Sequence, residues 1–396
     1  MLYKKYNWII IFSFFAYFFS TQISLKSIDY AERSIDFQVL SRLLITGVLF
    51  FFSLRYISSY IKVYLEKLWG IHAFLFLGLF FALVRGDYYP AYAVMTLIMA
   101  LLITYRFSTI FGRDVIYFYH AFVLFFTLIS IFYYYFIPDV GRYTYWQDGV
   151  IFQSPRMQGI AGHPNTLGFM LGSALLLSMT FGKDFILSKY GILSNAIIVL
   201  GLVLTNSRTN LMAVMILGSF YYFAVMGYGF QFILFLITFF LVLFSVYQIA
   251  PDIIQSFLGG FSRTGDLQEI FSFTGRSDIW QIVLDKFYES PIFGWGYAKS
   301  ADILGLNSDA VGFTVGQAHN LYLQVLISLG LLGAVVFFSW YAGLLSLSMR
   351  EKKFGQLIIL LYIAFVGFTE TIILNTIANN AFLVFCMVLV SDFPDE

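Results

Sequence analysis

The sequence predicts an all-α integral membrane protein with about twelve transmembrane helices and one large, partly helical extracytoplasmic loop. First, 60% of the 396 residues are hydrophobic, and the mean hydropathy is +0.82. Second, only 11% of the residues are charged, whereas soluble domains carry about 25%. Third, apolar runs of bilayer length recur along the chain, and the long stretch 250–318 interrupts them.

Roughly 17 to 25 mostly apolar residues are needed to cross the hydrocarbon core, and by this measure the third, seventh and last predicted spans are short. The spans are centred on 7–25, 37–57, 69–84, 90–107, 115–137, 161–181, 191–206, 209–227, 229–249, 319–348, 356–374 and 376–391. They divide the chain into a first transmembrane region over 1–249, an extracytoplasmic loop over 250–318 and a second transmembrane region over 319–396. No small-residue cleavage site follows the first span, so we expect it to be retained.

The distribution of Lys and Arg predicts the orientation of these spans. With the N-terminus inside, twelve Lys or Arg residues lie in cytoplasmic segments and six lie in short outer segments. Because positive charge accumulates on the cytoplasmic side, we expect both termini in the cytoplasm and the 250–318 loop outside.

Charge and cysteine content exclude several kinds of protein. The formal net charge is only +1, so nucleic acid is not an expected partner. Cys386 is the only cysteine, which excludes an intramolecular disulfide and C-x-x-C metal sites. The chain has no Walker motif, and the acidic residues of the loop lack EF-hand spacing. We therefore expect no metal and no cofactor.

The extracytoplasmic loop contains one predicted helix. Apolar residues recur at helical spacing between Gly275 and Ser290, namely Ile279, Trp280, Val283, Leu284 and Phe287. This pattern predicts a short amphipathic helix that either lies on the bilayer or caps a cavity.

Four arginines and one histidine lie at or just beyond the ends of apolar runs, all on the predicted outer face: Arg142, Arg156, Arg208, Arg276 and His319. Charge at a membrane edge is costly to order unless something anionic needs it. The convergence predicts an enzyme that acts on a phosphate-bearing lipid. For Arg142, a pair with Asp139 or Asp148 is an equal alternative.

His319 and Arg276 each lie at the predicted start of a helix. The positive helix end beside His319 and Asn320 favours a neutral imidazole that accepts a proton. The alternative is a histidine that caps the helix or rests at the interface. The guanidinium of Arg276 and the free N–H groups of its helix together suit phosphate oxygens, and the alternative is a solvated arginine.

Two further polar segments lie beside apolar runs. Arg208 belongs to the segment 205–210, whose polar neighbours favour a cavity over snorkelling of the arginine to headgroups. His163 and Asn165 lie at the entrance of the sixth span, where His163 is either a second titrating group or a cap.

Three more polar residues fall inside predicted spans. His72 and His120 have no carboxylate at helical spacing, so helix packing is the expected role. Glu370, in the eleventh span, is either a buried polar site or a hydrogen-bond partner of a neighbouring helix.

Five short motifs occur in order along the chain: Gly162-His163-Pro164-Asn165-x-x-Gly168, Asn206-Ser207-Arg208-Thr209, Gly275-Arg276-x-x-x-Trp280, Pro291-x-x-Gly294-x-Gly296 and His319-Asn320-x-x-Leu323-x-x-x-x-x-x-Gly330. This series resembles the O-antigen ligase and polymerase superfamily of bacterial cell-envelope glycosyltransferases, over roughly 160–340. The long outer loop lies between the Arg208 and His319 motifs, as it does in that superfamily.

The resemblance implies a GT-C-like glycosyltransferase of the bacterial plasma membrane, whose catalytic loop, 250–318, and active site face the extracytoplasmic side. The implied donor is an oligosaccharide linked to undecaprenyl diphosphate, and neither nucleotide sugar nor metal is needed. Family arginines matching Arg208 and Arg276 contact the donor diphosphate, and the family histidine matching His319 is the base. The further substrate-binding candidates are Arg142, Arg156, His163, Asn165 and Asn320.

The expected acceptor is either a growing glycan or another envelope molecule, with a flippase and a chain-length regulator as further candidate partners. We expect first a polymerase that builds O-antigen, capsule or exopolysaccharide. The runner-up is a ligase that moves the finished chain to lipid A core, protein or another acceptor. A lipid-linked glycan transporter would need arginines through the membrane midplane, and a scaffold protein would need neither His319 nor Arg276.

Overall fold

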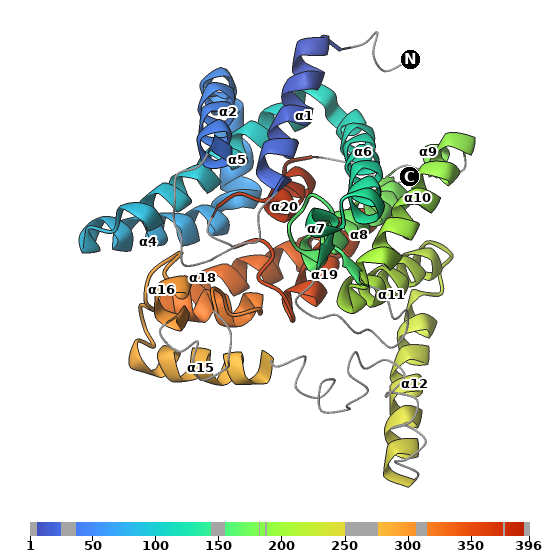
Figure 1. Ribbon diagram of the computed structural model, residues 1–396. Coiled ribbons are helices and arrows are strands. Elements are labelled where there is room, and N and C mark those ends of the chain that lie inside the picture. Colours follow the sequence, from blue (N-terminus) through green and yellow to red (C-terminus); the bar gives the residue numbers. More distant parts are fainter. Residues whose placement is uncertain are drawn as a thin grey trace.

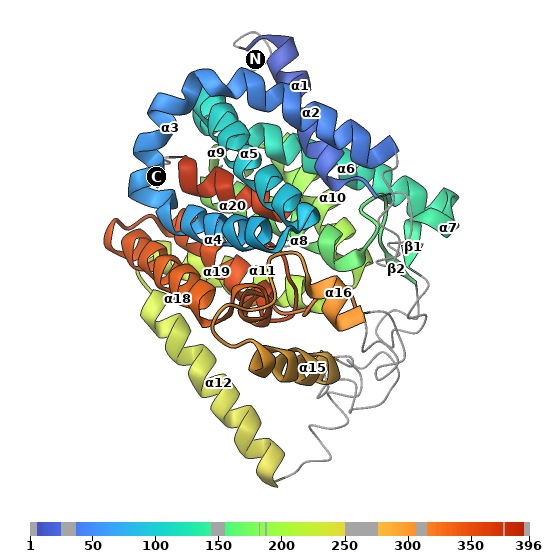
Figure 2. The same ribbon diagram turned by 90° about the vertical axis from the view of Figure 1, so that its left-hand side faces the viewer.

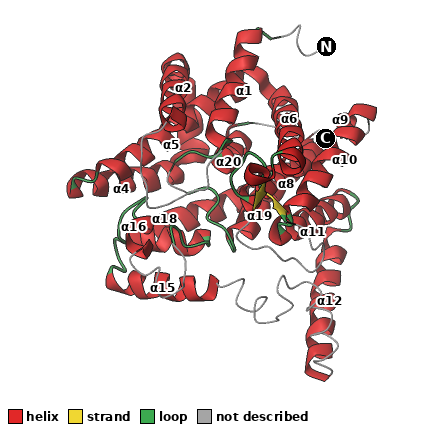
Figure 3. Cartoon of the chain, viewed as in Figure 1, coloured by secondary structure: helices red, strands yellow, loops and turns green. Residues whose placement is uncertain are grey.

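Helices make up nearly all the regular structure of the computed structural model (Figure 3). The structure describes residues 6–24, 37–143, 155–181, 183–186, 188–249, 276–305, 315–374 and 377–391. Within these residues, the only sheet is a short antiparallel pair in which Arg142 lies opposite Met157.

The first half of the chain forms helices that precede or flank the short sheet. They are α1 (Trp8–Gln22), α2 (Phe37–Ser53), η2 (Leu54–Tyr56), α3 (Ile57–Val63), η3 (Tyr64–Leu68), α4 (Trp69–Arg85), α5 (Tyr88–Phe111), η4 (Gly112–Asp114), α6 (Val115–Phe136) and α7 (Pro138–Gly141). The two strands are β1 (Arg142–Tyr143) and β2 (Arg156–Met157).

The second half continues the helix bundle and adds three helices at its periphery (Figure 1). The bundle helices are α8 (Pro164–Phe181), α9 (Lys183–Ile186), α10 (Lys189–Thr205), α11 (Arg208–Val225), α18 (Leu321–Arg350), α19 (Phe354–Gly367) and α20 (Asn380–Val390). The peripheral helices are α12 (Gly229–Ile249), which contacts α11 and extends away from the bundle, α15 (Arg276–Glu289) and α16 (Ser300–Gly305).

A helix overlaps each of the twelve predicted ranges. Three continuous helical stretches, Gln38–Arg85, Tyr88–Phe136 and Leu321–Arg350, are long and apolar enough to cross a bilayer. Shorter apolar helices include Trp8–Gln22, Lys189–Thr205, Gly229–Ser245, Phe354–Gly367 and Asn380–Val390. The chain is therefore a helical membrane protein, as predicted.

Several predicted spans differ from the observed helices at their ends, and two of these differences lie at the candidate polar residues. The eleventh was expected over 356–374, but α19 ends at Gly367, and the chain from Phe368 to Leu374 is not helical. Irregular backbone is tolerated at membrane depth when protein buries it, and the residues from Thr369 to Leu374 are buried. The tenth was expected from His319, but α18 starts two residues later because Asn320 caps it.

The core is densest around α20, in which every residue from Asn380 to Val390 is buried. This helix packs against α5, α8 and α19. At 11 residues it is about 16 Å long, too short to cross a bilayer unaided. It is therefore an internal helix enclosed by longer ones, as its central place in Figures 1 and 2 shows.

Helix α18 is kinked, and the segment 291–296 forms backbone hydrogen bonds with the residues at the kink. Leu329 and Gly330 have non-helical backbone angles, with φ of +60° at Gly330. The segment 291–296 supplies backbone hydrogen bonds at the kink: Trp295 N donates to Ile327 O at 2.8 Å, and Leu331 N donates to Pro291 O at 2.8 Å. The Pro291-x-x-Gly294-x-Gly296 motif is therefore a brace for α18.

The predicted amphipathic helix of the loop is α15, and its apolar face packs onto α18. Ile279 and Val283 are buried with Leu304, Ala318 and Ile327 in a small second core. Figures 1 and 2 show α15 on the side of α18 that faces away from α1 and α2, with α16 beside α18. This packing places Arg276, the first residue of α15, next to the helix bundle.

Candidate functional site

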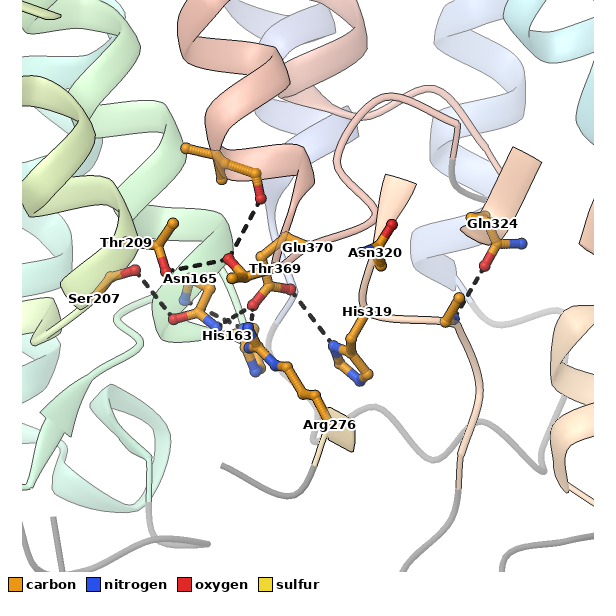
Figure 4. Close-up of polar contacts among 12 residues, drawn as sticks. His163, Asn165, Ser207, Thr209, Arg276, His319, Asn320, Gln324, Thr369 and Glu370 are labelled. Carbon is orange, nitrogen blue, oxygen red and sulfur yellow. Dashed lines mark hydrogen bonds and ion pairs between the residues drawn. The ribbon is translucent and has the colours of Figure 1, made fainter. Parts of the chain in front are cut away.

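Glu370 lies at the centre of the candidate site, in the irregular segment between α19 and α20 (Figure 4). Its side chain is only 9% exposed. Arg276 Nη2 lies 2.5 Å from Oε1, and His319 Nδ1 lies 3.5 Å from Oε2. The side-chain amide of Asn165 also donates to Oε1. Four segments far apart in the sequence therefore meet at one buried carboxylate.

Asn165 connects this carboxylate to a second layer of polar groups. Its Oδ1 accepts hydrogen bonds from Arg156 Nη2 at 2.5 Å and from Ser207 Oγ at 3.1 Å. Arg156 is buried, and its Nε donates to the carbonyl of Thr205 at 3.0 Å. These donors fix the oxygen of the Asn165 amide toward Arg156, which leaves the nitrogen facing Glu370.

The polar segment 205–210 joins three helices. Asn210 Nδ2 donates to Asn165 O at 3.2 Å and to Ser207 Oγ at 2.9 Å, while its Oδ1 accepts from Tyr362 OH at 2.6 Å. The hydroxyls of Thr209 and Thr369 lie 3.1 Å apart. Buried amides and hydroxyls need such partners, so this segment ties α11 to α8 and α19. Arg208 is the first residue of α11 and is half-buried.

Glu370 is ionised despite its burial. Arg276 Nη2 lies 2.5 Å from the carboxylate, and the attraction of this fixed guanidinium favours the charged form of the carboxyl and opposes the cost of its burial. A buried carboxylate of this kind is stable only with its partners in place. The Glu370 charge therefore depends on Arg276.

His163, just before α8, is neutral. Its Nδ1 accepts a hydrogen bond from Asn165 N at 3.2 Å, and its ring meets Tyr143 edge-on, with centroids 5.3 Å apart. His163 is half-buried. Burial lowers the pKa of His163 to about 3, although the charge of Glu370 opposes the change.

The backbone at His319 is held in an uncommon conformation. Its φ is +45°, in the left-handed region that residues other than glycine rarely adopt. Asn320 fixes the next residue: its Oδ1 accepts from Tyr322 N and Leu323 N, and its Nδ2 donates to Phe368 O at 3.0 Å. Strained backbone of this kind is concentrated at functional sites, where the surroundings enforce it.

Arg142 lies in a different setting from the other arginines. Its Nε donates to the carbonyl of Tyr134 at 2.9 Å, and its guanidinium lies over the Tyr134 ring, 5.1 Å from the centroid. These contacts tie β1 to the end of α6. Of its two alternative partners, Asp148 lies outside the described residues.

The structure thus gathers Arg276, His319, Asn165, Arg156 and His163 around Glu370. From the sequence, Glu370 was expected to be only a buried polar site or a hydrogen-bond partner of a neighbouring helix, because the predicted eleventh span was continuous through it. The available signal was the run Thr369-Glu370-Thr371, three polar residues in succession inside that span. Among the described residues, no three of the His, Cys, Asp and Glu side chains are grouped so that they would hold a metal ion.

Comparison with known families supports the resemblance that the short motifs indicate. Residues 193–338 match a family model described as O-antigen ligase, and this range includes Arg208, Arg276 and His319. A search of curated proteins gives no significant match. The family match agrees with the resemblance of the short motifs to the O-antigen ligase and polymerase superfamily.

Proposed function

We propose that this member of the O-antigen ligase and polymerase superfamily is a polymerase that joins oligosaccharide repeat units carried on undecaprenyl diphosphate. The observation that carries the proposal is the meeting of Arg276 and His319 at Glu370. It brings a fixed cation and a candidate base, both largely buried, to the same carboxylate. Polymerisation is preferred over ligation because such polymerases serve many envelope polymers, whereas a core ligase serves one.

In the proposed reaction, Arg276 and Arg208 stabilise the leaving group. The bond from the anomeric carbon to the phosphate oxygen breaks, and its electron pair passes to the lipid diphosphate. A guanidinium has five donors, and the contact with Glu370 uses Nη2 of Arg276. The rest of the fork suits phosphate oxygens, whose growing charge a preorganised cation stabilises.

His319 takes the proton in the same step. The Glu370 carboxylate beside Nδ1 favours the tautomer with hydrogen on Nδ1, so Nε2 accepts the proton of the acceptor hydroxyl. The hydroxyl oxygen attacks the anomeric carbon as the diphosphate leaves, which inverts that carbon. General-base help of this kind contributes about 10²–10⁴-fold to a rate.

The other predicted residues act as positioning groups in this proposal. Arg156 and Asn165 hold Glu370 through the hydrogen bonds already described, and Asn320 fixes the corner at His319. His163, as a neutral ring, packs against the same cluster. We propose that Arg142, in β1, binds the glycan.

The proposed location is the bacterial plasma membrane, with both termini cytoplasmic and the site extracytoplasmic. The bias of Lys and Arg toward the predicted inner segments supports this orientation. Lipid-linked repeat units would then reach the site after a flippase has moved them across the bilayer.

Ligation of a finished glycan is the second candidate. The specific observation in its favour is the family model itself, whose description is O-antigen ligase. The same arginines and histidine would serve, and only the acceptor would differ.

The test uses purified protein in lipid nanodiscs with undecaprenyl-diphosphate-linked oligosaccharide from its own host. We expect a ladder of multiples of the repeat unit, and no ladder from His319→Ala. A single transfer that appears only when an envelope acceptor is added would replace polymerase with ligase. Movement of the lipid across the bilayer without any new glycosidic bond would contradict both and indicate a transporter.

A further inference from the structure

Arg106, in α5, is a buried arginine whose charge no acidic side chain balances. It is only 7% exposed. In the part of the chain that the structure describes, its Nε and Nη1 are buried without a hydrogen-bond partner, and no carboxylate pairs with it. The guanidinium lies over the ring of Phe107, 5.6 Å from the centroid, a contact that supplies no oxygen acceptor. A buried cation without a partner is costly, so this position calls for an anion.

Snorkelling to water does not account for Arg106. An arginine that snorkels leaves its stem on apolar surface and carries its guanidinium nitrogens into solvent. Here two of the three nitrogens are buried, and only a small edge of the side chain reaches the surface. That edge gives an anion access to the guanidinium from outside.

A second arginine lies beside this edge. The charge of Arg55, on η2, and the Tyr56 side chain both act electrostatically on Arg106. Arg55 is exposed, and its Nη2 donates to Tyr56 OH at 3.1 Å. The rings of Tyr60 and Tyr105 lie 5.3 Å apart and hold α3 against α5 next to this pair. Two arginines at one place repel each other, and an anion that contacts both removes the repulsion.

The surface around Arg55 is partly apolar. Leu54, Ile57 and Ile61 are exposed on η2 and α3, and Ile57 and Ile61 lie four residues apart on one face of α3. Helix α3 runs along the outer edge of the bundle, between α2 and α4 (Figure 2). Exposed aliphatic side chains next to cations are typical of a membrane–water boundary. The surroundings therefore favour a lipid headgroup over a soluble anion.

Arg106 lies far along α5 from the loop that supplies the proposed transfer site. Helix α5 begins at Tyr88, next to Asp87, whose carboxylate lies 2.8 Å from Nζ of Lys299 in that loop. Arg106 follows Tyr88 by 18 residues, about 27 Å along the helix. The distribution of Lys and Arg predicts that this end is cytoplasmic. An anion at Arg106 is therefore distinct from the donor diphosphate.

We propose that Arg106 and Arg55 form a binding site for the phosphate of an anionic phospholipid in the cytoplasmic leaflet. Both guanidinium groups donate to the phosphate oxygens, which arginine suits well. The acyl chains lie along the exposed face of α3. Anionic headgroups in that leaflet attract basic segments near the membrane. The bound lipid would hold η2 to α5 by neutralising the two charges between them.

The test measures the Tm of the purified protein in phosphatidylcholine nanodiscs with a rising fraction of phosphatidylglycerol. We expect phosphatidylglycerol to raise the Tm of the wild type by about 3 °C or more, and not to raise that of Arg106→Gln. Arg350→Gln is the matched control, because Arg350 is exposed at the end of α18 on the same predicted side. A full rise in Arg106→Gln would overturn the inference, as would the absence of a rise in the wild type.

A second variant keeps the test decisive if Arg106→Gln does not fold. Arg55 is exposed, so Arg55→Gln leaves the core unchanged. We expect it to weaken the binding of phosphatidylglycerol, titrated by native mass spectrometry, by about ten- to 100-fold, the usual effect of one hydrogen bond to a charged group. Unchanged affinity in Arg55→Gln would overturn the assignment.

A further arm identifies the source of the phosphate. Inorganic phosphate is added to the wild type in phosphatidylcholine nanodiscs. No rise in Tm there, with a rise in phosphatidylglycerol, supports the lipid site, whereas an equal rise with inorganic phosphate would assign the arginines to a soluble anion and overturn the lipid assignment. Transfer is not measured, so an inactive polymerase site would leave this result unchanged.

Discussion

Two interruptions of apolar helices in the C-terminal part of the chain differ in how they are filled. The kink of α18 at Leu329–Gly330 is closed by backbone groups of residues 291–296. The break between α19 and α20 is filled by side chains, with Glu370 at its centre. We infer that the break closed by backbone groups serves stability, whereas the break that collects charged side chains serves the proposed transfer.

The largest effect is expected from a change at Glu370, at the centre of the break between α19 and α20. Glu370→Gln removes the carboxylate that faces Arg276 and His319, and we expect the transfer rate to fall by at least about 10²-fold. Glu289→Gln is the control, since Glu289 pairs with Lys286 on the exposed side of α15. Transfer assays on folded, nanodisc-embedded protein measure this effect. An active Glu370→Gln would show that the break between α19 and α20 has a structural role only.

A nearly equal effect is expected at Arg276. Arg276→Lys should lose almost as much transfer as Arg276→Ala, because a point charge cannot reproduce a planar fork that contacts Glu370 and phosphate together. Rates for the two variants are measured with the same lipid-linked donor. A mild Lys phenotype would instead indicate electrostatic steering by charge alone.

The first break should respond in stability. A Cβ added at Gly294 would lie 2.6 Å from Gly330 N, and one added at Gly330 would lie 2.4 Å from Ile292 O. Both glycines also have positive φ, so we expect Gly294→Ala and Gly330→Ala to destabilise the fold by about 1–3 kcal/mol or more. Thermal unfolding measures this against Gly305→Ala, whose added Cβ meets nothing within 4 Å. An unchanged Tm would refute the bracing role of residues 291–296.

An effect confined to acid pH is expected at His163, as a pH dependence of stability. The pKa of His163 is about 3 in the folded chain, against an ordinary value of 6.5. Between these two pH values the unfolded chain binds a proton at His163 and the folded chain does not. Stability is therefore complete above about pH 6.5 and falls as the pH drops toward 3. His163→Gln should show a shallower fall of Tm across this window, and identical slopes would contradict the assigned burial.

Much of the fold could be predicted from the sequence, because long apolar runs and the loop periodicity specify helices directly. Residues 279–287 predicted α15, and the short gap at Ser207-Arg208 proved to be a real helix boundary, with Asn206 in the left-handed region. The break at Glu370 could not be predicted, since hydropathy does not report where backbone leaves the helix. Nor does the sequence show that Asn165 links Arg156 to Glu370, which depends on the packing of α8 against α11 and α19.

The most direct test of the proposed transfer site separates donor binding from transfer in His319→Ala. Farnesyl diphosphate binding and the transfer rate are measured on the same nanodisc preparation, with wild type alongside. We expect unchanged binding and a transfer rate lower by about 10²-fold or more, because only the base is removed. Full transfer by His319→Ala would show that the histidine facing Glu370 is not the base.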